Sequence, residues 1–435
     1  MKNLLKAACV SGLALAMPAA STAEEVTIAT VNNGHMIVMQ RLAGVFVNEN
    51  PGVELNWITL DEGSLRSRVT QDILQEGGQF DIMTIGMYEA PIWGSRGWLE
   101  PLNFSAAYDT QDILPAIRDG LSHDGQLYAA PFYGESSMIM YRADLVRAAG
   151  LSIQDNPSWT EIRQIAAAIH NPDDGVYGIC LRGKPGWGDN MAFITTLANS
   201  FGAQWFNMDW TPALDSPEWT QAIDFYVDLL NSYGPPAADT MSFNEILSLF
   251  NAGRCGMWID ATIAASFVSD PGQSSVANQV AFAQAPRGVT TKGANWLWAW
   301  ALAIPAGSEN AEGAKRFIEW ATSKGYIQLV GAERGWGAVP TGTRVSTYEN
   351  PAFRAAATFD EAELSAILSA NPNDSTLNPS PYTGVQFAAI PEFQSIGTAV
   401  AEQMSAALRG DVSVRDALAA SQAEADRQMR AAGYY

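Results

Sequence analysis

The chain has 435 residues, of which 47% are hydrophobic, and its 46 acidic and 25 basic residues give a formal net charge of −21 at pH 7. At roughly 150 residues per domain, this length predicts two or three domains, and the apolar content is ample for large cores. The excess of negative charge argues against nucleic acid and anionic lipid surfaces as partners, because both would be repelled.

The first 23 residues have the pattern of a secretory signal peptide. Lys2 and Lys6 form a short basic region, residues 7–20 are apolar or small throughout, and residues 21–23 offer small side chains to a signal peptidase. The apolar run is too short to serve as a membrane anchor. We therefore expect cleavage after Ala23 and a soluble, exported chain.

Strand and helix patterns alternate in the segment that follows. The expected strands are residues 25–31, 53–60 and 80–85, and the expected helices between them are residues 36–48 and 64–75. Such alternation predicts crossover connections and a parallel sheet covered by helices on both faces. Ligands bind beyond the carboxyl ends of such strands. The polar, glycine-containing loops at these ends cover residues 32–34, 61–63 and 86–89.

Residues 128–142 form an extended run that is too long for a routine strand and has Gly134 at its centre. A chain that passes from one lobe to another would have this pattern. Three helices then begin at serine caps, namely Ser158, Ser216 and Ser242. The tail, residues 394–430, is mostly alanine-rich helix.

Two cysteines remain after the expected cleavage, Cys180 and Cys255, and both lie on apolar, strand-like runs. In an exported chain they are compatible with one disulfide between neighbouring strands, and about equally with two buried free thiols. The three histidines are far apart in sequence, and no Cys/His cluster has the spacing of a zinc site. We therefore expect no metal and no cofactor.

Residues 295–304, NWLWAWALAI, carry tryptophans at every second position. On a strand, this spacing places Trp296, Trp298 and Trp300 on one face. Indole rings suit ligands that offer C–H faces between hydroxyl groups, as carbohydrates do. The alternative is that a sheet packs these rings into its own core, and we assign Trp300 to such a core.

Enzyme motifs are incomplete. Residues 178–184 have the spacing of a phosphate-binding loop, but Pro185 stands where a serine or threonine must hold magnesium. Residues 134–138 begin like a nucleophile elbow but lack its closing glycine. Carboxylates are abundant, so an exported carbohydrate-active hydrolase remains a second hypothesis.

Taken together, several segments resemble the family 1 extracellular solute-binding proteins of bacterial ABC importers. These segments are VTIATV (26–31), FDI (80–82), APFYG (130–134), GRCGMW (253–258) and the strand-helix unit at 298–315. Within the family, residues 86–102, 131–145 and 296–305 are most similar to the branch that binds sugar alcohols such as mannitol and sorbitol.

The resemblance implies a type II periplasmic binding protein fold of class α/β. Two lobes, each a mostly parallel sheet flanked by helices, would be joined by hinge strands near Glu135, residues 299–301 and residues 338–341. Lobe one would comprise residues 24–135 plus 301–339, and lobe two residues 136–300 plus 340–435. The C-terminal helices would pack on lobe two.

The implied function is that of a monomeric periplasmic receptor, not an enzyme. It would capture a mannitol-, sorbitol- or arabitol-like ligand by hinge closure and deliver it to inner-membrane permease subunits with their ATPase. A monosaccharide or disaccharide ligand is the alternative within this class.

A polyol requires charged hydrogen-bonding groups from both lobes. The candidate hydroxyl acceptors are Glu62, Glu135 and Asp260, and the candidate donors are Arg182, Lys184 and Asn33. The candidate stacking residues are Trp298, Trp187, Trp296, Tyr88 and Trp336. Other roles compete: a hinge ion pair for Glu135, a helix cap for Asp260, a surface salt bridge for Arg182 and a solvated loop for Glu62.

Overall fold

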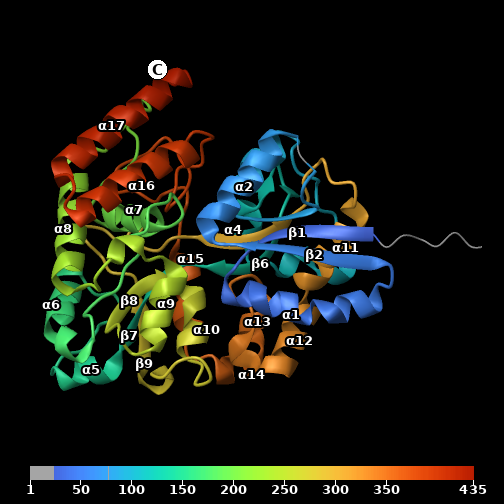
Figure 1. The fold of residues 1–435 in the computed structure, drawn as a ribbon, viewed down its shortest axis with the longest axis horizontal. Helices are drawn as coiled ribbons and strands as arrows, with labels where there is room; N and C mark the ends of the chain where they lie inside the picture. The colour runs from blue at the N-terminus through green and yellow to red at the C-terminus, as the bar shows by residue number, and fades with distance from the viewer. Residues whose placement is uncertain (1–23, 77) are drawn as a thin grey trace, which may run out of the picture.

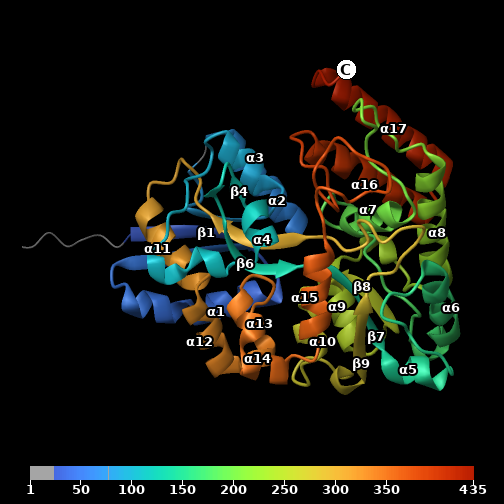
Figure 2. The same cartoon turned by 180° about the vertical axis from the view of Figure 1, so that it is seen from behind.

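A computed structural model describes residues 24–76 and 78–435. The expected signal peptide, residues 1–23, lies outside the described residues. Within the part that is described, no helix has the length and apolar character needed to cross a membrane. Figures 1 and 2 show two lobes side by side, with α17 (Val414–Ala431) along the outer edge of one of them.

The first sheet has five strands in the order β2-β1-β3-β10-β6. Its strands are β1 (Glu24–Val31), β2 (Val53–Leu60), β3 (Ile82–Ile85), β6 (Ala130–Glu135) and β10 (Trp298–Ala303). β1 pairs in parallel with β2 and β3, whereas β10 is antiparallel to both β3 and β6. β1, β2 and β3 therefore run in the same direction, as the alternating pattern predicted, and β6 shares that direction.

The second sheet differs from the expected one. It has the order β8-β7-β9, with β7 (Ser137–Arg142), β8 (Met257–Ala261) and β9 (Val280–Gln284), and both pairings are antiparallel. The expectation of a mostly parallel sheet in this lobe is therefore wrong for β7, β8 and β9. The strand-helix alternation that predicts crossover connections occurs only in the first lobe. In the second lobe, the only parallel pairing beside β8 among the described residues consists of isolated bridges at Tyr177 and Cys180.

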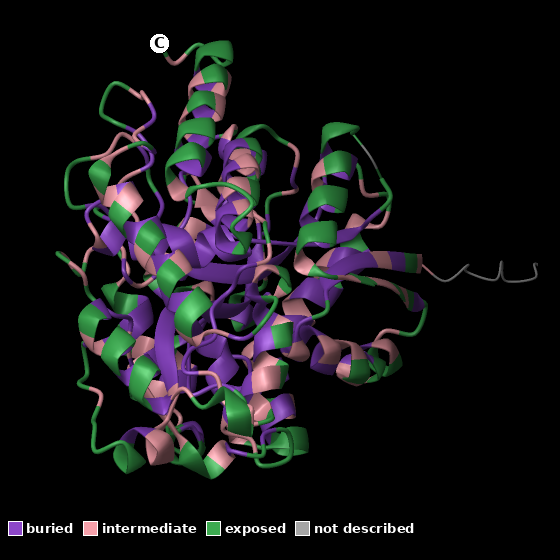
Figure 3. Cartoon of the chain, turned by 60° about the vertical axis from the view of Figure 1, so that its left-hand side comes forward, coloured by how far each residue is buried: buried purple, intermediate pink, exposed green. Residues whose placement is uncertain are grey.

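The helices cover the two sheets. Those around the first sheet are α1 (Gly34–Glu49), α2 (Glu62–Leu74), α3 (Glu89–Ser95), α4 (Pro115–Gly120), α11 (Ala311–Ala321), α12 (Lys324–Arg334), α13 (Val345–Glu349) and α14 (Pro351–Ala356), with a small hairpin of β4 (Ser122–His123) and β5 (Gln126–Leu127). Those of the second lobe are α5 (Ala143–Ala148), α6 (Trp159–Ile169), α7 (Asn190–Ser200), α8 (Pro217–Tyr233), α9 (Phe243–Asn251), α10 (Ala265–Val268), α15 (Asp360–Ser369), α16 (Phe393–Arg409) and α17. Buried residues concentrate on the sheets and on the inner faces of these helices (Figure 3).

The helix starts follow from the serine caps. Ser158 caps α6 and Ser242 caps α9, each within a complete capping box, and Ser216 accepts a hydrogen bond from the backbone of α8. Each cap satisfies a backbone N–H that the first helical turn leaves without a partner.

Cys180 and Cys255 form a disulfide, with 6.0 Å between their Cα atoms. The bridge joins the segment before Arg182 to the segment that leads into β8. Of the two arrangements expected for these cysteines, the structure has the disulfide.

The chain passes between the lobes at Ser136, where β6 of the first sheet ends and β7 of the second begins. β10 pairs with the first sheet from Trp298 onward, three residues before the expected boundary at Ala301. Gly134 donates its backbone N–H to the Thr341 carbonyl at 2.9 Å. Any Cβ at Gly342, whose φ is +75°, would overlap the Gly134 backbone, so only glycine permits these two segments to approach so closely.

Beyond this point the chain continues to pack on the first lobe. The buried Arg344 donates to the carbonyl oxygens of Thr322 and Tyr108, and the Ser346 hydroxyl donates to Asp112. Residues 344–346 therefore pack against the first lobe, whereas the expected boundary between residues 339 and 340 placed them in the second lobe. α15 then packs on β7 and β9. We retain the two-lobe division as a proposal with these shifted boundaries.

Candidate binding site

A cavity lies between the two lobes. Its walls combine aromatic rings with charged and amide side chains. The lining residues are Glu62, Arg66, Glu135, Arg182, Trp187, Gly188, Ala192, Trp296, Trp298, Trp300 and Gln386. They come from α2, β6, the loop before α7, α7 itself, β10 with the stretch that leads into it, and a loop near the C-terminus. Each lobe therefore supplies part of the wall.

The tryptophan run forms one wall, and the expectation from its every-second-residue spacing is met. Trp298 and Trp300 lie on β10, Trp296 lies just before it, and all three line the cavity. The Trp298 ring meets Trp300 edge to face, with centroids 5.7 Å apart. A side chain at Gly86 would overlap the Trp298 indole, so the absence of a Cβ there lets the ring lie over the end of β3.

Arg66, on α2, lies among these rings. Its guanidinium carbon is 4.2 Å from the ring centroid of Trp187, 4.8 Å from that of Trp298 and 4.6 Å from that of Trp300. Its Nη1 atom pairs with the buried Glu89 carboxylate at 3.3 Å. Cation–π attraction and the ion pair together hold this side chain against the wall.

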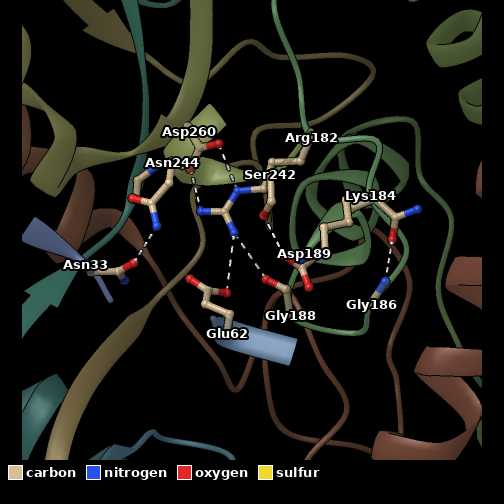
Figure 4. Close-up of polar contacts among 12 residues, drawn as sticks. Asn33, Glu62, Arg182, Lys184, Gly186, Gly188, Asp189, Ser242, Asn244 and Asp260 are labelled. Atoms are coloured by element: carbon tan, nitrogen blue, oxygen red, sulfur yellow. Dashed lines mark hydrogen bonds and ion pairs between the residues drawn. The ribbon is translucent and has the colours of Figure 1, made fainter. Parts of the chain in front are cut away.

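Arg182 is the centre of the polar wall (Figure 4). Its Nε and Nη2 atoms donate to the two Asp260 oxygens at 2.8 and 2.6 Å, and Nη1 donates to the Gly188 carbonyl at 3.2 Å. Asp260 is fully buried and also accepts from the Trp258 indole N–H. Burial alone would lower the pKa of Arg182, but the carboxylates of Asp260, Glu62 and Asp189 together outweigh it and the net shift is upward.

Glu62, at the start of α2, extends across the lobe interface toward this guanidinium, with 3.8 Å between its Oε2 atom and Nη1 of Arg182. Burial raises the pKa of Glu62, and the nearby Arg182 offsets only part of that shift. This pair therefore draws the two lobes together across the cavity.

Glu135, the last residue of β6, is 7% exposed. Within residues 24–76 and 78–435, no hydrogen bond or ion pair reaches its carboxyl group. Burial raises the pKa of Glu135 to about 8, with Arg182 opposing the shift and Glu62 and Asp260 adding to it. At pH 7 this side chain is mostly neutral.

We expect Glu135→Gln to stabilise the ligand-free protein above pH 8. The pKa of Glu135 is raised on folding, so its contribution to stability is lost as pH rises from 4.5 to about 8. At roughly 1.4 kcal/mol per unit of pKa, the gain in the glutamine variant should approach a few kcal/mol at pH 8.5 and vanish near pH 4.5. Urea unfolding at several pH values measures it. A gain that is equal at all pH values, or one also seen in the exposed-surface variant Glu402→Gln, would contradict this account.

Further contacts between the lobes close the cavity. Asn244 on α9 donates to Asn32 at 3.2 Å and to Asn33 at 3.4 Å, as Figure 4 shows for Asn33. The Tyr88 hydroxyl donates toward the Ile390 carbonyl at 3.0 Å, and the His35 ring lies 3.2 Å from the Ser266 hydroxyl. The lobes are thus in a closed arrangement.

The cavity brings together six of the residues predicted from the sequence, namely Glu62, Glu135, Arg182, Trp187, Trp296 and Trp298. Asp260 lies behind the wall as the partner of Arg182, in place of capping a helix. Tyr88 packs against Trp187 with centroids 4.9 Å apart and supports it from outside the lining.

The other predicted residues lie elsewhere. Asn33 donates to the Tyr133 hydroxyl at 2.9 Å and belongs to the closing contacts. Lys184 is about one-third exposed and pairs with Asp61 at 3.5 Å, across the lobes. Trp336 lies against Gly331 of α12, away from the cavity, because the chain around it packs on the first lobe.

Arg66, Trp300 and Gln386 line the cavity but were not predicted to do so. Trp300 was assigned to a core, and it is indeed buried, yet its spacing from Trp298 already placed both rings on one face. Gln386 uses both ends of its amide on the Leu297 backbone, at 3.2 and 2.9 Å. No local pattern in the sequence distinguishes Gln386 or Arg66 from surface residues.

Several buried hydrogen-bond donors around the cavity have no acceptor among the described residues. The indole N–H groups of Trp187, Trp296 and Trp298 are buried and have no acceptor among the described residues, and the same holds for Nε of Arg66. Buried donors without acceptors are costly, so they favour a ligand that carries oxygen atoms. Within the described part of the chain, no cluster of His, Cys, Asp and Glu could hold a metal ion.

Comparison with known proteins identifies the family. Residues 35–328 match the family of bacterial extracellular solute-binding proteins. The mannitol-binding protein of Pseudomonas aeruginosa is 53% identical to this chain over 436 aligned positions, which cover 100% of both chains. The chain belongs to the bacterial extracellular solute-binding protein family.

Two solved structures are similar to this solute-binding protein over nearly its whole length. An ABC transporter solute-binding protein from Agrobacterium vitis S4, with bound D-mannitol, is 54% identical and has a TM-score of 0.94 over 94% of this chain and 99% of that one. Another from Agrobacterium radiobacter K84, in complex with ribitol, is 25% identical and has a TM-score of 0.82 over 93% and 98%. The two-lobed α/β fold and the family resemblance are confirmed.

Proposed function

We propose that this solute-binding protein captures a sugar alcohol such as mannitol, sorbitol or arabitol between its lobes and delivers it to an ABC importer. The observation that carries the proposal is the cavity between the lobes, whose lining combines the three tryptophans of residues 296–300 with Arg182, Glu62 and Glu135. Indole faces accept the C–H edges of an alditol chain, while charged groups bind its hydroxyls.

The bound ligands of solved relatives support a small ligand. The two relatives described above hold D-mannitol and ribitol, each a single alditol. The cavity lining of this chain comes from both lobes, so one small ligand could contact both lobes at once when they are closed.

The same proposal includes the protein's place in the cell. The signal-like residues 1–23 and the family membership favour a periplasmic receptor that is cleaved after Ala23. It would act as a monomer and present its closed form to the inner-membrane permease subunits and their ATPase. Closure by ligand is a shift in population, so the affinity for the closed state must exceed that for the open one.

A thermal-shift panel of mannitol, sorbitol, arabitol, glucose, maltose and trehalose tests the ligand class. A ligand that binds only the folded protein should stabilise it by about 2.7 kcal/mol when present at 100 times its Kd. We expect the alditols to raise the melting temperature and the disaccharides to leave it unchanged. Stabilisation by maltose or trehalose alone would overturn the proposal, and product formation from oligosaccharides on long incubation would show a hydrolase instead.

A further inference from the structure

The ionisable groups of the cavity do not all have partners of opposite charge. Both arginines of the lining already have carboxylate partners that lie behind the wall, Glu89 for Arg66 at 3.3 Å and Asp260 for Arg182 at 2.6 Å. Each of these pairs is neutral as a whole. Two lining carboxyl groups, Glu62 and Glu135, are therefore left over.

Neither of the two has a counter-ion of its own. The nearest cation to Glu62 is Nη1 of Arg182 at 3.8 Å, which already donates to the Gly188 carbonyl. Glu135 is more than nine-tenths buried, and no described residue donates to its carboxyl group. A buried carboxylate without a partner is unfavourable, so a cation brought by the ligand would complete this part of the cavity.

From this imbalance we infer that the cavity also binds amino alditols, in which an ammonium group replaces one terminal hydroxyl and is held by Glu135 with Glu62. The inference rests on the proposed function, because the hydroxyl chain would occupy the same walls. It also implies that aldonates, which carry a carboxylate at that position, are rejected.

The two ligand types make different demands on Glu135. A hydroxyl group both donates and accepts, so it suits the neutral and the ionised carboxyl group, whereas an ammonium group only donates and requires the ionised form. The charged and titratable groups around Glu135 are Arg182, Glu62, Asp260, Arg66 and Tyr133. Because burial raises the pKa of Glu135 to about 8, ammonium binding below pH 8 should expel a proton from it.

Calorimetry with D-mannitol, 1-amino-1-deoxy-D-mannitol and D-mannonate at pH 7 and 8.5 tests the inference. At pH 7, in buffers of different ionisation enthalpy, the amine should release about one proton and mannitol almost none. We expect the amine to bind at least threefold tighter than mannitol at pH 8.5, and mannonate to bind at least 100-fold more weakly. The preference for the amine over mannitol should grow as pH rises toward 8.

Variants separate the role of Glu135 from general charge effects. Glu135→Gln should weaken both ligands but should shift the amine-to-mannitol ratio of Kd by at least tenfold against the amine. Glu402→Gln removes the same charge from the exposed face of α16 and should leave that ratio unchanged.

The outcomes distinguish the inference from the proposed function. If mannitol binds and the amine binds tenfold more weakly, or if Glu135→Gln weakens both equally, the inference is wrong while the proposed function stands. If the amine binds and mannitol does not, the proposed function fails, and with it the inference that amines bind in addition to neutral alditols. Absence of binding by both would overturn both.

Discussion

Replacing Arg182 with methionine should abolish alditol binding and lower the free energy of unfolding by about 3–5 kcal/mol. The guanidinium is the only cation that contacts the fully buried Asp260 among the described residues, and it does so through two hydrogen bonds. Methionine keeps the stem volume but leaves the carboxylate without a counter-ion. Urea unfolding measures the stability, and calorimetry with mannitol measures the binding.

Arg163→Met is the matched control. Arg163 pairs with Asp228 at 2.6 Å, the same distance as in the Arg182–Asp260 pair, but the two side chains are 45% and 46% exposed. Solvent screens such a pair, so its removal should cost less than about 1 kcal/mol and leave binding intact. Equal losses in the two variants would show that burial does not decide the contribution of the Arg182 pair.

Trp298→Ala should weaken mannitol binding at least 100-fold while the ligand-free protein stays folded. The indole is part of the cavity wall and has Arg66, Trp187 and Trp300 as neighbours, so its loss removes stacking surface for the ligand and one of the three rings against Arg66. Calorimetry measures the affinity, and circular dichroism with a melting curve checks the fold.

Trp336→Ala provides the comparison for this substitution. It removes the same ring from a half-buried position against α12, outside the cavity, and should change the affinity less than threefold. An unchanged affinity in Trp298→Ala, or an equal loss in Trp336→Ala, would mean that the ligand does not lie against the tryptophan wall.

The first lobe could be predicted closely from the sequence. Residues 25–31 and 53–60 were expected as strands and form β1 and β2, because alternating strands and helices constrain both direction and order. The antiparallel second sheet and the packing of residues 344–346 on the first lobe could not be predicted. Both depend on pairings between distant segments, such as Arg344 with Tyr108, that leave no periodic signal.

The same distinction holds for the site. The tryptophan spacing is a local pattern, and it predicted residues that do converge on the cavity. Arg66 lies on a helix whose sequence resembles an ordinary solvated surface. Arg66 becomes part of the wall because Trp187 and Trp300, from distant segments of the chain, pack against it. No single stretch of sequence indicates this packing.

The disulfide has a consequence for how the protein matures. Cys180 stands two residues before Arg182 and Cys255 five residues before Asp260, so the bond fastens together the two segments that carry this ion pair. Disulfides form in oxidising compartments and are rare in the cytosol. The disulfide would therefore form only after export. The segments that carry Arg182 and Asp260 would be linked covalently only in the compartment where the protein meets its ligand.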